Sequence, residues 1–133
     1  AISLAGGSIG RGLELRDQSY VQWSGGTIGM SILCGGVGDT EDTCLIDLLG
    51  SSFFVNGHAL SIGQSARDWA VPGQVSGQTS LTGILTGTLA NGDAIHNTFH
   101  IFGDSDIVYV PEPGMVVLLG LGAMRIRKQR TIK

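Results

Sequence analysis

The stretch Ser3-Leu4-Ala5-Gly6-Gly7-Ser8-Ile9-Gly10 recurs nineteen residues later as Gln22-Trp23-Ser24-Gly25-Gly26-Thr27-Ile28-Gly29. A partial echo follows at Cys34-Gly35-Gly36-Val37-Gly38. Between the two full copies, residues 13–16 and 20–23 alternate apolar and polar side chains, which predicts half-exposed strands. Short strands joined by Gly-Gly corners at a period near twenty are typical of β-solenoid coils. An ordinary antiparallel sheet with glycine turns is the alternative interpretation.

From residue 39 onward the pattern changes to that of a small module of β-hairpins. The predicted strands share β-branched, aromatic or aliphatic residues between turn signals: 45–49, 52–55, 58–62, 81–89, 94–102 and 106–110. Asn56-Gly57 is a strong type I′ hairpin signal, and Asn91-Gly92 predicts a second reversal. Residues 63–78 are polar apart from a short apolar knot, so we expect a loop there.

The predicted fold class is all-β. We expect β-solenoid-like coils over residues 1–38, a small β-hairpin or sandwich-like module over 39–110, and a short apolar helix within a C-terminal segment over 111–133. The first residues already carry the repeat pattern, and two isolated coils cannot bury their faces. We therefore expect them to be the last coils of a longer array.

Composition favours strands and turns and argues against one class of partner. Glycine is 22 of the 133 residues, and charged residues make up 14%. Before Arg125 there are eleven acidic residues and three basic ones (Arg11, Arg16 and Arg67), a balance of −8, against −3 for the whole chain. Because nothing there would neutralise phosphates, no nucleic-acid partner is expected.

The end of the chain joins three unlike segments. Pro111-Glu112-Pro113 bars a helix and predicts a stiff, exposed spacer. An uncharged run follows: Gly114, Met115, Val116, Val117, Leu118, Leu119, Gly120, Leu121, Gly122, Ala123 and Met124. Five of the eight Lys and Arg residues then close the chain: Arg125, Arg127, Lys128, Arg130 and Lys133. By the positive-inside rule, this order places the basic end in the cytoplasm and residues 1–110 outside.

This order resembles the PEP-CTERM sorting signal of Gram-negative bacteria, which a membrane protease-transpeptidase, exosortase, recognises. The resemblance implies that Pro111, Glu112 and Pro113 are the recognition residues, residues 114–124 the membrane segment, and Arg125, Arg127, Lys128 and Arg130 the stop-transfer cluster. It also implies an exported protein that is held at the inner membrane and then reaches the cell surface or the extracellular matrix, with exopolysaccharide as a neighbour.

The uncharged run departs from the family in its length. As a helix it would span roughly 16 Å, against a hydrocarbon core of roughly 30 Å. Snorkelling of Arg125 and Arg127 and thinning of the bilayer would recover part of the difference. The alternative is that residues 116–124 form a buried helix or strand of a water-soluble domain.

Cys34 and Cys44 flank an acidic turn. Two cysteines in an exported protein can pair, and closing a loop of about ten residues would stabilise the fold by roughly 2 to 3 kcal/mol. The sequence leaves this disulfide open. Asp39, Glu41 and Asp42 lie between the cysteines, but without the glycine-anchored spacing of a calcium loop, so a solvated turn is expected.

No constellation of residues predicts catalysis, a metal site or a cofactor. His96 and His100 have helical metal-ligand spacing, but they lie in a predicted strand, where they share one face with Thr98. His58 is expected on the surface. Glu14 and Arg16 point outward together, which usually marks a solvated pair.

The protein is therefore expected to be a non-catalytic surface or matrix protein. The alternative is the C-terminal part of a secreted polysaccharide lyase or carbohydrate-binding β-helix protein, in which Tyr20 or Trp23 would stack on a sugar ring.

Overall fold

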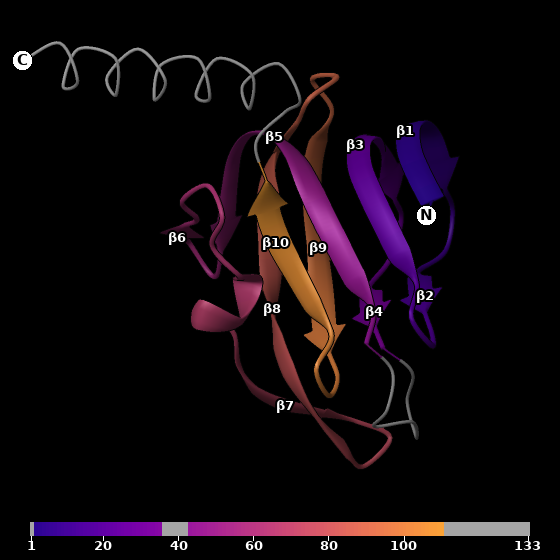
Figure 1. Cartoon of the computed structure of the whole chain (residues 1–133), viewed down its shortest axis with the longest axis vertical. Helices are drawn as coiled ribbons and strands as arrows, with labels where there is room; N and C mark the ends of the chain where they lie inside the picture. Colours follow the sequence, from indigo (N-terminus) through magenta and orange to yellow (C-terminus); the bar gives the residue numbers. More distant parts are fainter. Residues whose placement is uncertain (1, 36–42, 111–133) are drawn as a thin grey trace, which may run out of the picture.

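The computed structural model describes residues 2–35 and 43–110, which form an all-β fold (Figure 1). The strands are β1 (Ile2–Ile9), β2 (Leu13–Leu15), β3 (Tyr20–Ile28), β4 (Ile32–Cys34), β5 (Leu45–Val55), β6 (His58–Ala59), β7 (Val71–Val75), β8 (Gln78–Leu89), β9 (Ala94–Ile101) and β10 (Asp106–Val110). One short 3₁₀ turn, η1 (Ala66–Asp68), lies between β6 and β7. The all-β class predicted from the sequence is confirmed.

The strands form one curled, nearly closed sheet. Its main path runs β1-β3-β5-β8-β9-β4-β2, while β10 and β6 pair with β5, and β7 pairs with β8. Because β1 and β2 follow each other in the chain, both ends of this path lie at the same end of the molecule, on the right in Figure 1.

The sequence repeat is also a repeat of the structure. In the parallel pair β1–β3, Ile2 aligns with Val21, and in the parallel pair β2–β4, Leu13 aligns with Ile32, so both pairs are offset by nineteen residues. We call residues 2–15 the first coil and residues 20–34 the second coil. The expected Gly-Gly corners lie within β1 and β3, where the register shifts near Ala5, so each strand bends without ending.

β5 joins this parallel stack to the hairpins. Its first half pairs in parallel with β3 and β10, and its second half pairs antiparallel with β8. The sequence predicted two separate strands here. Gly50 allows one continuous strand, because a Cβ at this position would lie 2.1 Å from the Thr88 carbonyl oxygen.

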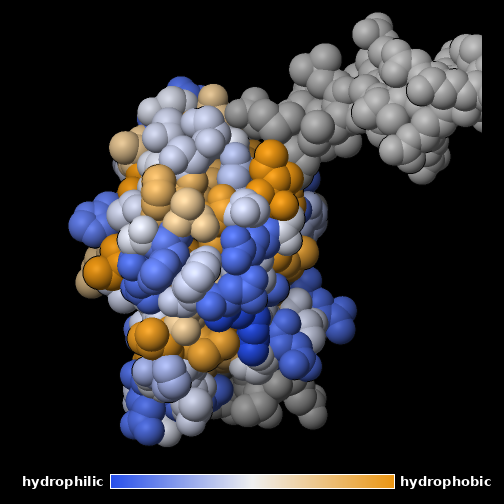
Figure 2. Space-filling view, turned by 90° about the vertical axis from the view of Figure 1, so that its left-hand side faces the viewer, coloured by the Kyte–Doolittle hydropathy of each residue, from blue (hydrophilic) through white to orange (hydrophobic). Residues whose placement is uncertain are grey.

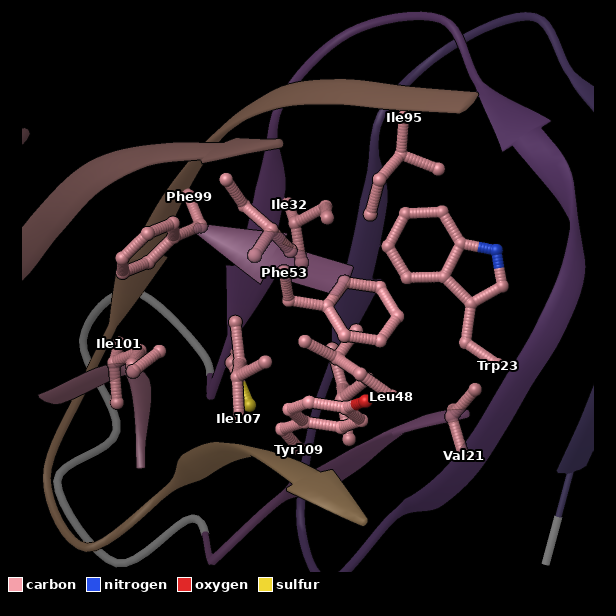
Figure 3. Packing of buried hydrophobic residues seen from close by; sticks show 14 of the residues in the cluster. Val21, Trp23, Ile32, Leu48, Phe53, Ile95, Phe99, Ile101, Ile107 and Tyr109 are labelled. Carbon is pink, nitrogen blue, oxygen red and sulfur yellow. The ribbon is translucent and has the colours of Figure 1, made fainter. Parts of the chain in front are cut away.

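One hydrophobic core fills the curled sheet, and Figure 3 shows its centre. Trp23 from the second coil, Phe53 from β5 and Tyr109 from β10 are all buried in it. The Phe53 and Tyr109 rings meet edge to face, with centroids 4.9 Å apart. Core residues therefore come from both sides of the expected boundary between residues 38 and 39.

Between β5 and β8 the structure has the predicted turn at Asn56-Gly57 but differs from the predicted strand and loop that follow it. Asn56 and Gly57 both have positive φ, at 51° and 82°, as a type I′ turn requires, and they join β5 to β6. The strand predicted at residues 58–62 is shorter, because only β6 pairs. The loop predicted at 63–78 is wrong, since it contains η1 and β7. Pro72 and Gly73 are tolerated in β7 because this strand lies at an edge of the sheet.

Several expectations fall outside the described residues. These are the acidic residues Asp39, Glu41 and Asp42, the third glycine echo after Gly35, and everything from Pro111 onward, including the predicted apolar helix at 114–124. Across residues 2–35 and 43–110, no helix has both the length and the hydropathy needed to cross a membrane.

Candidate functional site

The first coil presents two strand edges, those of β1 and β2, at the two ends of the main path of the sheet. Among the described residues, β1 pairs only with β3, and β2 pairs only with β4. Ile2 is 56% exposed, whereas Val21, which aligns with it in the second coil, is 2% exposed. We call the outer sides of β1 and β2 the open edge. A strand edge with unpaired backbone groups and partly exposed apolar side chains can pair with a further strand.

The opposite end of the parallel stack is closed. Residues 63–65 and Arg67 form an edge cap over β10. The amide of Gly63 donates to the Tyr109 carbonyl at 2.6 Å, and the Tyr109 amide donates to the Gln64 carbonyl at 3.1 Å. Ser65 forms an antiparallel bridge with Val108. The backbone N–H and C=O of Tyr109, on the outer edge of β10, are therefore already occupied.

Side chains complete the edge cap. The Asp106 carboxylate accepts from the Ser65 hydroxyl at 2.5 Å and from the Ile107 amide at 2.8 Å. Ser65 in turn accepts from the Arg67 amide at 3.0 Å. The Arg67 guanidinium donates to the carbonyls of Gly103 and Ser105 at 2.9 and 2.8 Å, which fixes the turn before β10.

The edge cap was not predicted from the sequence, because residues 63–78 were expected to form a loop. Two local signals could have indicated an ordered turn in this segment, although not its contact with β10. Ser65 stands just before η1 as an N-cap residue, and Arg67 is one of three cations before Arg125.

A second set of hydrogen bonds joins the β8–β9 turn to the Gly-Gly corner of the second coil. The Asp93 carboxylate accepts from the Gly26 amide at 2.8 Å and from the Asn91 side-chain amide at 2.9 Å. These two hydrogen bonds, with that from Asn91 the larger cause, lower the pKa of Asp93. The backbone amide of Asn91 donates to the Ser24 carbonyl at 3.0 Å. Asn91-Gly92 was predicted only as a turn, but it also holds the corner in place.

The disulfide left open by the sequence is not present between the two described cysteines. The Cys34 thiol donates to the carbonyls of Cys44 and Asp106, at 3.5 and 3.3 Å, and the Cys44 thiol donates to the Asp17 carbonyl at 3.4 Å. The sulfur of Cys34 thus lies within hydrogen-bonding distance of the backbone of Cys44. Burial raises the pKa of the Cys34 thiol, which disfavours the reactive thiolate.

The histidines of β9 lie on its outer face, as the strand prediction required. Burial alternates along β9, with His96 exposed, His100 half-buried and their neighbours Ile95 and Phe99 buried. His100 Nδ1 lies 3.1 Å from the Ser80 hydroxyl, and burial lowers the pKa of His100. No group of three His, Cys, Asp or Glu side chains that could hold a metal occurs in the part of the chain that the structure describes.

The residues considered for sugar contact are not arranged for it. Trp23 is 1% exposed, and its indole donates to the Gly26 carbonyl at 3.2 Å, so the suggestion that it stacks on a sugar is wrong. Tyr20 is half-buried and donates to the Asp47 carboxylate, and this hydrogen bond raises the pKa of Tyr20. Glu14 and Arg16 form an exposed ion pair at 2.8 Å, as predicted for a solvated pair.

An exposed aromatic pair lies near the hairpins. His58 stacks on Trp69 with centroids 4.1 Å apart and rings 7° from parallel, so His58 is more than a plain surface residue. Figure 2 shows the side that carries β6 and η1, where hydrophobic surface is broken into separate patches by polar residues. Nothing on this side indicates what would cover it.

The predicted sorting signal lies outside the described residues. It comprises the recognition residues Pro111, Glu112 and Pro113, the membrane segment 114–124, and the basic cluster Arg125, Arg127, Lys128 and Arg130. They remain predictions. No protein-family model, curated protein or solved structure matches this chain.

Proposed function

We propose that this chain is part of a non-catalytic surface or extracellular-matrix protein that a Gram-negative bacterium exports and sorts through a PEP-CTERM signal. Its body is a set of β-solenoid-like coils, the last of a longer array, finished by the hairpins of β5–β9. Exosortase is the processing partner, the inner membrane holds the intermediate, and exopolysaccharide is the neighbour outside the cell.

The observation that carries this proposal is the order of segments after Val110: a Pro-Glu-Pro spacer, an uncharged run and a basic cluster. That order provides a recognition site, an apolar segment and a cytoplasmic stop. The edge cap, within the folded part of the chain, also supports the proposal. It completes the outer edge of β10, the last strand before Pro111, so the strand stack is closed where the tail begins.

C-terminal mass spectrometry of the exported protein tests this function. In a Gram-negative host that has exosortase, we expect the mature protein to lack residues 125–133. Replacing Pro111, Glu112 and Pro113 by alanine should leave those residues attached, because the recognition segment is gone. Pro72→Ala, which alters an exposed proline outside the tail, is the matched control and should be processed normally.

Two outcomes would overturn the proposal. One is exported protein with an intact C-terminus in a host that processes other substrates of exosortase. The other is cleavage of uronate polymers by the full-length protein, which would favour the alternative of a secreted polysaccharide lyase.

A further inference from the structure

We propose that the open edge is an interaction surface for one more coil of the same nineteen-residue repeat, stacked parallel to β1 and β2, and that Gly6, Gly7 and Gly10 admit its backbone. This inference rests on the array in the proposed function and names the surface and the residues through which the array continues. It is carried by the contact that already exists between the first and second coils.

That contact depends on close approach of the two backbones. A Cβ added at Gly25 would lie 2.2 Å from the Ala5 carbonyl oxygen and 2.2 Å from the Asn91 side-chain amide nitrogen. A Cβ at Gly26 would lie 2.8 Å from the Gly6 carbonyl oxygen, and one at Gly29 would lie 2.7 Å from that of Gly10. Real Cβ atoms do not approach backbone oxygens so closely. The second coil therefore needs glycine at these positions because the first coil lies directly against them.

The first coil has the same three glycines, at positions nineteen residues earlier, but without those neighbours. A Cβ added at Gly6, Gly7 or Gly10 meets no atom of the described residues within 4 Å. The folded chain thus gives no steric reason for glycine at Gly6 and Gly10, which do not have positive φ. A preceding coil at the same offset would bring its carbonyls to all three positions, as the first coil does for the second.

The apolar side chains support the same partner. Trp23, Ile28 and Ile32 of the second coil are buried, whereas Leu4, Ile9 and Leu13, which align with them, are only partly buried. These rows of side chains run along the stack and end at the open edge. A further coil would extend each row by one residue and remove its exposed end from water.

A second copy of the chain fits this edge less well. Parallel addition would require the outer edge of β10 of that copy, and the edge cap already occupies it. The partner that meets the geometry is a coil within the same polypeptide, joined to Ile2 by the kind of turn that joins the first coil to the second.

The experiment extends the chain by one coil. A copy of residues 2–20 is inserted directly before Ile2 of the full chain, which keeps the offset of nineteen. We expect the β1 amides to exchange with solvent at about one tenth of their rate in the parent chain, or more slowly still. The reason is that β1 changes from an edge strand to an interior strand. The urea unfolding midpoint should rise as well.

Glycine substitutions then separate stacking from stability of the parent fold. Gly6→Ala with Gly10→Ala should leave the parent chain unchanged but abolish both gains in the extended chain. The same two substitutions in the added coil are the matched control, since its glycines have no coil before them, and both gains should persist. Gly25→Ala should destabilise both chains.

The inference fails if the added coil leaves exchange of the β1 amides unchanged, or if Gly6→Ala with Gly10→Ala leaves the gains of the extended chain intact. Either result would leave the C-terminal processing test unaffected, because that test reads only the tail. Loss of processing would in turn leave the stacking result unaffected.

Discussion

The first coil and β10 are both outermost strand layers of one parallel stack, but they end it in different ways. At β10, residues 63–65 hydrogen-bond to the outward backbone of Tyr109, and the Asp106 carboxylate accepts from the Ile107 amide. At the first coil, the strand edges have no such cover among the described residues, and the apolar row ends in an exposed Ile2. The difference teaches that a repeat strand alone does not finish a stack. A separate segment must hydrogen-bond to the outward backbone groups of the last strand.

The largest expected loss of stability is at Trp23, in the interior of an apolar row, and it is compared with the loss at the open end of the same row. Trp23→Ala should lower the free energy of unfolding by about 3 to 5 kcal/mol, because it leaves a cavity in a packed core. Leu4→Ala, at the aligned position of the first coil, should cost about 1 kcal/mol, since Leu4 is partly exposed. Urea unfolding measures both, and equal losses would show that the first coil is packed as tightly as the second.

A smaller effect is expected at the edge cap. Arg67→Ala should lower the free energy of unfolding by about 2 kcal/mol, because it removes charged hydrogen bonds to the Gly103 and Ser105 carbonyls. Arg16→Ala, which breaks an exposed ion pair in the first coil, should change it by less than about 0.5 kcal/mol. Thermal unfolding of the two variants provides the measurement. A loss at Arg16 as large as that at Arg67 would remove the distinction between the closed and open ends.

The smallest effect depends on pH and concerns Asp93, which holds the glycine corner of the second coil. Its pKa is lowered in the folded protein, so its charge stabilises the fold above the ordinary carboxyl pKa of about 4. This stabilisation is lost as the pH falls below about 4, through the lowered pKa. Asp93→Asn should therefore be less stable than the parent chain at pH 7, with the gap narrowing towards pH 3.

Urea midpoints at both pH values would measure this gap. A gap that does not depend on pH would mean that the carboxylate charge has no part in holding the corner.

The repeat could be predicted from the sequence because it is local. Ser3-Leu4-Ala5-Gly6-Gly7 and Gln22-Trp23-Ser24-Gly25-Gly26 differ in side chains but keep their glycines, and the glycines of the second coil lie against the backbone of the first coil. The offset of nineteen in the sequence is the offset of the strand pairs. β10 and the turn at Asn56-Gly57 were found for the same reason, since strand alternation and turn chemistry are also local signals.

The edge cap and β7 could not be predicted in this way. Gln64 and Tyr109 are far apart in the chain, and the loop-like composition around Ser65 gives no hint that it meets Asp106. Trp23 was misjudged because alternation shows which residues share a face of a strand but not which face lies inside. The sequence left the pairing of Cys34 and Cys44 open, because close spacing of two cysteines says nothing about the direction of their sulfurs.

The parallel pairing of β10 has a mechanical consequence. Asp106 to Val110 align residue by residue with Leu45 to Leu49, so β10 pairs in parallel with β5 along its whole length up to Val110. A pull from the C-terminal side would load these backbone bonds in shear, so that they must break together and not one after another. A body tethered by its tail would therefore resist drag through its final strand.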